Sequence, residues 1–573
     1  MKAGQQFPKN KISRPHTEIN VDTSGIGGSS SSSDKILMLA GSAKGGAPDT
    51  VYKVRNFQEA QQVFRSGDLL DAIELAWNPD TEGTSAGDIL ALRVEDAENA
   101  ELEQGGLTFE SKLYGNEAND IQVSLADNDL TDTKRLQVVF PKERYSKTFD
   151  NLGKIFSIEY TGSEAQAAFS VEENKDTKRV ERLVLKTGSS SGDGEGNLEE
   201  ETSFKLGEGV YEDTNVLIAE INNLPDWKAK FFPIGDKNVQ TSTFEPVEDK
   251  DAKQEESYVE ALGGDIQKQL AYNEYVTVTV DTSKDIANFS LSNLEGGTDG
   301  VAPTSWADKF KQFANKGGFY LVPLSDKPSV HAEALSFANG RTDIGEPMRI
   351  IVGGGTGESI EEMITRATNL RDPRAAVFGM SGSRRMDNGQ IKRLPAYLLA
   401  AQAGGLAAGL EIGEALTFKH FNITQLDRIF EGPQLDMLNE SGVIGLEYVR
   451  NRTKTFFRIV QDVTTYNDPT EPVRNEMGVG ESNDFLVSEL KIKLDNEYIG
   501  TKVVDSSASL IKNFVQSYLD EKKRRDEIQD YSPGEVQVIL DGDVAMISMM
   551  IQPVRSLNKI VVNLRYEQQV LTA

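Results

Sequence analysis

The sequence has no cysteine and only three histidines among its 573 residues. Without cysteine, the chain can form no disulfide, no thiolate metal site and no cysteine nucleophile. The three histidines (His16, His331 and His420) are widely spaced, which argues against a histidine-rich metal site. We therefore expect no bound metal.

Long apolar runs are also missing. The longest uncharged stretch, residues 394–410, is mostly Ala and Gly and is short for a membrane span of about 20 residues, so we interpret it as a buried helix. Residues 1–14 are polar and lack the apolar core of a signal peptide. We expect synthesis in the cytoplasm and no membrane insertion.

Basic residues are in deficit. Lys and Arg number 61 against 90 Asp and Glu, which gives a formal net charge of −29. Non-specific binding to nucleic acid or to an anionic membrane needs a basic surface, so neither is expected as a partner. The excess of acid favours solubility at high concentration, or a partner that carries basic patches.

Both ends of the chain carry a period-two apolar pattern, which is typical of a half-buried strand. The alternating residues are Thr17, Ile19 and Val21 near the start, and Ile560, Val562, Leu564 and Tyr566 near the end. A Gly/Ser-rich tether, up to residue 33, follows the first set. Such strands can either close the chain's own sheet or complete the open sheet edge of a neighbouring subunit.

Two segments, 34–97 and 290–455, alternate short apolar runs with helical patterns. Their runs at 36–40, 349–352 and 375–378 are typical of strands buried on both faces. We interpret the two segments as one discontinuous α/β domain with a mainly parallel sheet.

The segment between them, 98–289, has short alternating runs that predict one or two inserted, mainly β outer domains. Its polar stretch at 189–201 is interpreted as a loop.

The last segment, 456–573, is predicted to be a small α+β domain. It has an amphipathic helix with an apolar stripe from Leu510 to Leu519 and a hairpin that turns at Asp541-Gly542. So small a sheet is marginal alone, and strand exchange between subunits would complete it.

Catalytic and cofactor motifs are missing. The Gly-rich turn at 353–359 has Glu358 where a dinucleotide site has glycine, and it lacks the lysine of a phosphate-binding loop. No serine lies in a strained G-x-S-x-G turn, and His331 is interpreted as a structural histidine. We predict no catalytic residue and no cofactor.

Four adjacent cations close the amphipathic helix: Lys522, Lys523, Arg524 and Arg525. One interpretation is a favourable interaction with the helix dipole, worth about 0.3–1 kcal/mol. The other is docking onto an acidic partner surface. The sequence supports both.

Several segments resemble the sheath proteins of contractile phage tails. They are 114–116 (YGN) with 119–124 (NDIQVS), 294–300 (LEGGTDG), 460–465 (VQDVTT), and the C-terminal helix and hairpin. The opening residues 13–27 (SRPHTEINVDTSGIG) look like the sheaths of large Twort-like phages of Gram-positive hosts. The likeness extends over essentially the whole chain.

The resemblance implies a structural subunit that is not an enzyme. Sheath proteins form stacked hexameric rings around a tail tube protein, between baseplate and tail terminator proteins, and contract to drive the tube through the host envelope. The family's C-terminal domain accepts terminal strands from neighbours. Its C-terminal helix faces the tube, which favours tube contact by Lys522 to Arg525. Its central domain is subtilisin-like in shape, but this chain shows no matching catalytic set.

Two other classes remain as alternatives. A secreted multidomain hydrolase with β accessory domains would be favoured by a signal peptide and a convergent catalytic cluster, and neither is seen. A capsid or adhesin protein would be favoured by coiled-coil or β-helix repeats, and none is seen.

Overall fold

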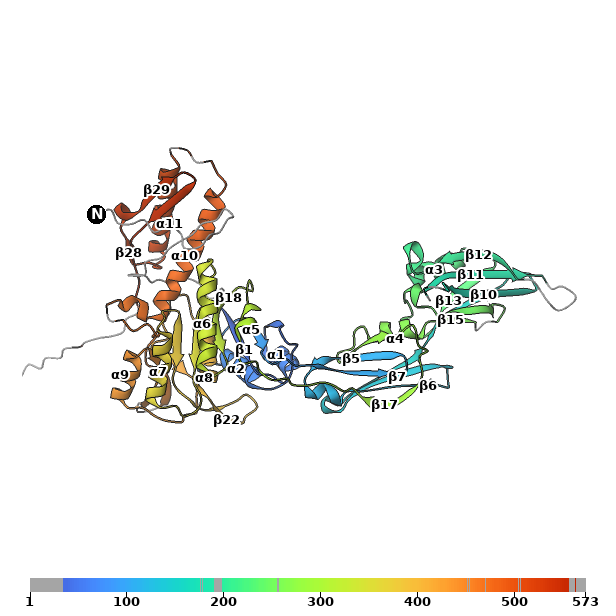
Figure 1. Cartoon of the computed structure of the whole chain (residues 1–573), viewed down its shortest axis with the longest axis horizontal. Coiled ribbons are helices and arrows are strands. Elements are labelled where there is room, and N and C mark those ends of the chain that lie inside the picture. Colours follow the sequence, from blue (N-terminus) through green and yellow to red (C-terminus); the bar gives the residue numbers. More distant parts are fainter. Residues whose placement is uncertain are drawn as a thin grey trace, which may run out of the picture. The chain divides into compact units, whose positions relative to one another are not determined.

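The computed structural model describes residues 35–555, except 176, 178, 190–197, 255–256, 451, 453, 469, 503 and 505, together with Val562. The chain divides into two units, one formed by residues 1–96 with 302–573 and the other by 97–301 (Figure 1). The multidomain, mixed α/β character expected from the sequence is confirmed.

A seven-stranded sheet forms the centre of the first unit, in the order β2-β3-β1-β18-β19-β20-β25. Its strands are β1 (Ile36–Gly41), β2 (Val51–Val54), β3 (Ile89–Arg93), β18 (Gly318–Pro323), β19 (Arg349–Gly353), β20 (Ala375–Phe378) and β25 (Val443–Ile444). All neighbouring pairs are parallel except β2 with β3, which is antiparallel at the edge. The strands expected from the apolar runs at 36–40, 349–352 and 375–378 are therefore present. They are almost wholly buried, as strands covered on both faces should be.

Helices pack on this sheet. They are α1 (Phe57–Phe64), α2 (Asp68–Trp77), α5 (Ala307–Lys311), α6 (Pro328–Asp343), α7 (Ile360–Leu370), α8 (Ala396–Gly409) and α9 (Gly432–Glu440). Helix α8 is the buried helix expected at 394–410, and it packs against α2. Its small residues allow this approach, because a Cβ at Gly405 would overlap the backbone of Ala76 in α2. Among the described helices, none has the length and apolar content needed to cross a membrane.

The first unit also contains two three-stranded sheets, whose strands come from residues 382–459. One has the order β22-β21-β24, with β21 (Gly382–Arg385), β22 (Ile391–Leu394) and β24 (Gln425–Leu426). The other has the order β23-β27-β26, with β23 (His420–Phe421), β26 (Leu446–Arg450) and β27 (Thr455–Ile459).

The second unit is mainly antiparallel β structure with two apolar cores. One core is formed by the two ends of the segment 97–301. It contains α4 (Leu262–Leu270) and the strands β4 (Asn99–Gln104), β5 (Leu107–Tyr114), β6 (Gln122–Asn128), β7 (Thr133–Phe140), β8 (Tyr145–Leu152), β16 (Val276–Val280) and β17 (Phe289–Asn293). The other contains α3 (Thr214–Asn222) and the strands β9 (Lys154–Tyr160), β10 (Gln166–Glu173), β11 (Val180–Gly188), β12 (Glu199–Lys205), β13 (Trp227–Phe231), β14 (Val247–Asp251) and β15 (Tyr258–Glu260).

The C-terminal part of the first unit has an apolar core of its own, built around two helices (orange and red in Figure 1). Its elements are α10 (Met477–Tyr498), α11 (Ser507–Arg524), β28 (Asp530–Tyr531), β29 (Gln537–Asp541), β30 (Val544–Ser548) and β31 (Ile551–Gln552). The hairpin β29–β30 turns at Gly542, whose φ of 64° suits glycine. The expected stripe on α11 is correct except for Leu510, which is 53% exposed. Helix α10 has no counterpart in the sequence-based prediction.

Candidate functional site

Most of the residues expected to donate strands lie outside the part of the chain that the structure describes. Thr17, Ile19, Val21, Ile560, Leu564 and Tyr566 are all in this group. Val562 is described, and it is 73% exposed and not part of a strand. Donation of these strands stays a prediction.

The four cations at the end of α11 do not form one surface patch. Lys522 is only 4% exposed, and its Nζ contacts Glu489 Oε2 at 2.5 Å and also the carboxylate of Glu527. Burial alone would lower the pKa of Lys522, but its hydrogen bonds to Glu489 and Glu527 outweigh this effect and raise the pKa. Lys522 therefore forms an internal ion pair that joins α11 to α10.

The other three cations are exposed. Lys523 lies 2.8 Å from Asp530, and Arg525 lies 2.5 Å from Glu521. The Nε of Arg524 donates to the carbonyl oxygen of Asp520 at 3.3 Å, and within the described chain Arg524 has no ion pair. Tube contact by these residues stays a prediction, and Lys523, Arg524 and Arg525 are the three that can reach a partner.

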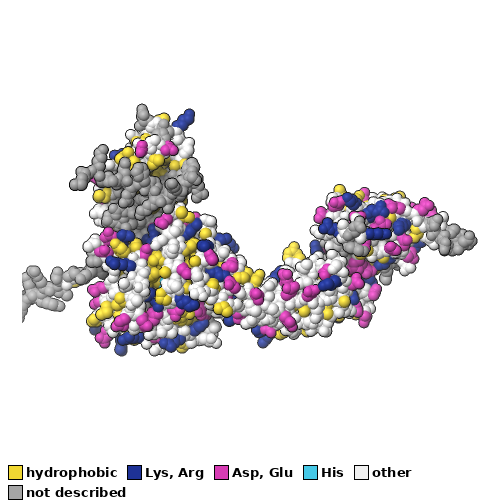
Figure 2. Space-filling view, viewed as in Figure 1, with side chains coloured by type: hydrophobic (Ala, Val, Ile, Leu, Met, Phe, Trp, Pro, Cys, Tyr) yellow, Lys and Arg dark blue, Asp and Glu magenta, His cyan; other side chains and the backbone are white. Residues whose placement is uncertain are grey.

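The exposed face of α11 is poor in acid. It consists of Ser509, Leu510, Asn513, Ser517 and Asp520, followed by Lys523 and Arg524. The single carboxylate, Asp520, accepts a hydrogen bond of 2.7 Å from the hydroxyl of Tyr531. Acidic and basic side chains are interspersed elsewhere on the surface drawn in Figure 2. A neutral-to-basic helix face is thus a local exception in an acidic chain.

The hairpin β29–β30 has open edges. It forms a two-stranded sheet with no third strand among the described residues, and so do β28 and β31. Val538 and Ile547 pair across the hairpin and pack on the C-terminal core. Ile539 and Val544 are on the opposite face, where they are 54% and 52% exposed. Open backbone groups beside an exposed apolar face are what an incoming strand requires.

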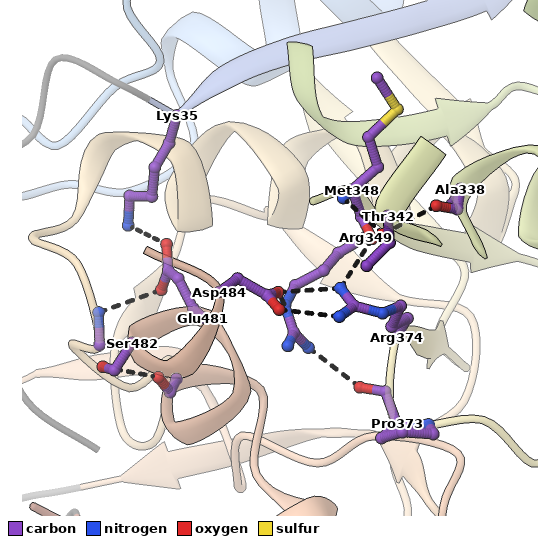
Figure 3. Close-up of polar contacts among 12 residues, drawn as sticks. Lys35, Ala338, Thr342, Met348, Arg349, Pro373, Arg374, Glu481, Ser482 and Asp484 are labelled. Carbon is purple, nitrogen blue, oxygen red and sulfur yellow. Dashed lines mark hydrogen bonds and ion pairs between the residues drawn. The ribbon is translucent and has the colours of Figure 1, made fainter. Parts of the chain in front are cut away.

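The N-terminal turns of α10 hold a cluster of buried charges (Figure 3). The side chain of Asp484 is 3% exposed, and its carboxylate accepts a hydrogen bond of 2.8 Å from the Nε of Arg349 in β19. It also accepts hydrogen bonds of 3.0 and 2.8 Å from the two Nη atoms of Arg374. Gly480 makes room for this contact, because a Cβ there would overlap the guanidinium of Arg349. These pairs join α10 to the central sheet.

Lys35 reaches the same helix from the other end of the chain. Its Nζ lies 2.7 Å from Glu481 Oε1 and donates to the carbonyl oxygen of Glu411 at 3.0 Å. The backbone N–H of Gly413 donates to Glu481 Oε2 at 3.2 Å. Both charged side chains are almost fully buried. Burial raises the pKa of Glu481, and Lys35 partly offsets this rise.

A third acid of the cluster, Asp462, has no ion-pair partner among the residues that the structure describes. Asp462 is 3% exposed, its Oδ2 accepts the N–H of Gly478 at 2.8 Å, and its Oδ1 lacks a hydrogen-bond partner among the described residues. Burial raises the pKa of Asp462 to about 7. The Gly478 N–H opposes the shift, and the nearby charges of Glu481 and Glu476 add to it.

The N-cap residue of α10, Glu476, forms an ion pair with Arg555 near the C-terminal end of the described residues. Glu476, the N-cap of α10, lies 2.5 Å from Nη2 of Arg555. The side chain of Glu476 is 6% exposed and that of Arg555 is 44% exposed. The sequence carries one signal of this cluster, Asp462, a charged residue inside the 460–465 motif.

The Gly-rich turn after β19 is held by the chain's own side chains. Glu358 accepts the N–H of Gly355 at 2.9 Å and pairs with Arg366. His331 is 1% exposed and lies 2.6 Å from the carbonyl oxygen of Ser325, as expected of a buried, hydrogen-bonded histidine. Burial lowers the pKa of His331 to about 4, so it is neutral at pH 7. In the described parts of the chain, no group of three or more His, Asp or Glu could hold a metal ion.

Comparison with known proteins gives close relatives over the full length. The chain is 65% identical over 572 residues to a protein of Enterococcus phage phiEF24C that is assigned to the tail sheath, and it covers 100% of both chains. It is 50% identical over 592 residues to the tail sheath protein of Staphylococcus phage Twort, with 99% of each covered. No protein-family profile matches the chain.

Solved structures share the fold at low identity. A sheath tail protein from Listeria innocua is 12% identical with a TM-score of 0.55, over 92% of this chain and 94% of that one. Another from Desulfitobacterium hafniense is 14% identical with a TM-score of 0.53, over 99% and 100%.

Proposed function

Because this chain belongs to the phage tail sheath proteins, we propose that its copies stack in six-fold rings around a tail tube and are held together by exchanged terminal strands. It is a structural subunit of a contractile phage tail. Contraction of the assembled sheath drives the tube through the host cell envelope. Subunits assemble in the host cytoplasm and become part of the virion tail.

The observation that carries the proposal is the incomplete C-terminal sheet. The hairpin β29–β30 exposes Ile539 and Val544 and has free edges within the described chain. A two-stranded hairpin is marginal in water unless further strands or packing support it. The period-two patterns at 17–21 and 560–566 supply strands of matching character. In the proposed assembly, one strand from each of two neighbours extends this sheet.

Exchange of this kind makes an open assembly. The donated strand and the accepting edge are different surfaces, so the contact is heterologous and propagates from subunit to subunit. A contractile sheath then needs two stable packings of folded subunits, related by rigid-body movement. The extended packing is kinetically trapped until it is triggered. The energy comes from assembly, so no catalytic step and no nucleotide are needed.

The tube contact is proposed for the exposed face of α11. Ser509, Asn513 and Ser517 offer neutral hydrogen-bonding groups, and Lys523 and Arg524 offer positive charge. This surface suits a tube with acidic and polar groups, since opposite charges across an interface favour docking and fix its register. Baseplate and terminator proteins are the proposed partners at the two ends of the sheath.

Electron microscopy of the purified protein tests strand donation. We expect the full chain to form long tubes and the variant lacking residues 1–24 to remain as folded monomers. A finer pair of variants compares the two faces of the arm. Ile19→Asp adds a charge to the apolar face, and Asn20→Asp adds the same charge to the polar face. Tubes should be lost in the first and kept in the second. If the truncated protein still polymerised normally, the arm would have no such role.

A further inference from the structure

Both ends of the described chain attach to the same two turns of α10. Lys35, which follows the N-terminal arm and tether, pairs with Glu481 at 2.7 Å. Arg555, which precedes the C-terminal strand pattern, pairs with Glu476 at 2.5 Å. The two acids are five positions apart, which is about 7.5 Å along a helix axis. Asp484, three residues further on, locks this helix to the central sheet through Arg349 and Arg374.

We propose that Lys35 and Arg555 are positioning residues, which fix the points and directions at which the two terminal arms leave the subunit. The inference rests on the proposed function, in which those arms pair with neighbouring subunits. Because both roots are held on one rigid helix, the offset between them is set within each subunit.

The surroundings of Arg555 indicate that its role is placement rather than stability. Its side chain is 44% exposed, and an ion pair of that exposure adds little to the stability of a folded subunit. Glu476, in contrast, is 6% exposed and lies near the unpaired Asp462 and the buried Glu481. Arg555 is thus the cation that neutralises the outer side of an acidic cluster, and it brings the root of the tail with it.

Fixing the root matters for assembly because a strand held at its base has fewer conformations to lose when it pairs. Preorganisation of this kind improves association without any new contact. Arg555 is three residues beyond β31 (Ile551–Gln552). Release of the Glu476 contact would add about 10 Å of free chain, at roughly 3.3–3.6 Å per residue. The tail would then search a larger volume before it met its acceptor.

The test measures the critical protein concentration for tube formation with the full-length chain. Arg555→Ala is expected to raise it roughly threefold to fivefold, the factor that an ion pair of this exposure can supply. Arg555→Lys, which keeps the charge, should restore assembly to near the wild-type value. Arg182→Ala is the control for loss of a half-exposed surface pair, since Arg182 and Glu172 are 42% and 41% exposed and lie 2.9 Å apart in the other unit. It should leave the critical concentration unchanged.

Monomer melting and hydrogen exchange separate placement from folding. Glu476→Gln leaves only the exposed Arg555 without this contact, so its monomer should melt with the wild type, while exchange at residues 549–555 becomes faster. Arg555→Ala removes the cation beside the buried Glu476, so its melting temperature is compared with that of Glu476→Gln, and exchange at the same residues should again become faster. For the N-terminal root, Lys35→Met with Glu481→Gln removes both charges together, because either change alone would leave a buried charge unpaired. An unchanged critical concentration in Arg555→Ala and Glu476→Gln would overturn the inference.

One further variant separates this inference from the function beneath it. Leu564→Asp puts a charge on the apolar side of the C-terminal strand pattern in the full chain. If Leu564→Asp forms normal tubes, donation of that strand is wrong, and the positioning role of Arg555 fails with it. If Leu564→Asp blocks assembly while Arg555→Ala assembles as wild type, strand donation stands and only the positioning role is refuted. Impairment in both supports both.

Discussion

Replacing Asp462 with Asn should stabilise the subunit at neutral pH and have little effect near pH 4. Burial raises the pKa of this carboxyl from 3.8 to about 7, so the folded chain holds its proton more tightly than the unfolded chain does. The contribution of Asp462 to the free energy of unfolding therefore falls as pH rises from about 4 to about 7, and it is level above pH 7. About three pKa units at roughly 1.4 kcal/mol each give a cost of about 4 kcal/mol at pH 8. The Asn variant avoids this cost.

Urea unfolding of the monomer between pH 4 and pH 8 measures the effect, followed at the transition of the unit that contains α10. The amide oxygen of Asn can still accept the N–H of Gly478, and its NH₂ replaces an oxygen that already lacks a partner. Asp468→Asn, in the same unit, is the control of opposite sign, because hydrogen bonds from Thr470 lower the pKa of Asp468. A stability difference for Asp462→Asn that stayed constant across this pH range would refute the reasoning.

Two further predictions concern Asp484 in α10 and the exposed cations at the end of α11. Asp484→Asn should cost roughly 3–5 kcal/mol in urea unfolding, because it leaves Arg349 and Arg374 without their anion inside the protein, and a loss below 1 kcal/mol would contradict this. Lys523→Ser with Arg524→Ser should weaken assembly around purified tubes while leaving tubeless self-assembly intact. Equal loss in both assembly assays would point to a role in folding instead.

The sequence predicted those elements whose pattern is local. Strands such as β1 and β20 are short apolar runs between turns, and their burial on both faces follows from that composition. Helix α8 was found because an uncharged Ala/Gly-rich stretch of that length suits a buried helix. The hairpin β29–β30 was found because Asp541-Gly542 is a strong tight-turn signal between alternating residues.

Helix α10 was missed because its pattern is not amphipathic. Its first turns contain Gly478 and Gly480, which weaken a helix, and polar residues that are buried. The buried Glu481 and Asp484 find their cations in segments far away in the sequence. Periodicity assigns charged residues to the solvent side, so it fails where distant ion pairs hold charges inside.

The burial of Lys522 could not be predicted for the same reason. A run of cations at the end of an amphipathic helix is typical of a solvated face, and the sequence pattern does not distinguish Lys522 from the rest of the run 522–525. The acid that buries Lys522 is Glu489, which belongs to the unpredicted α10. Without α10, nothing in the sequence separates Lys522 from its three exposed neighbours. The four residues therefore divide by tertiary contact into one internal ion pair and three surface charges.

The distribution of charge between the two units bears on how copies could pack together. Residues 97–301 hold 41 of the 90 acidic residues and 20 of the 61 basic ones, a net charge of −21. The remainder, which contains α11 and the β29–β30 hairpin, carries only −8 over 368 residues. Like charges oppose close packing of identical subunits, and net charge keeps exposed domains soluble. The proposed contact surfaces are thus in the nearly balanced unit, and the repulsive charge is concentrated in the insertion.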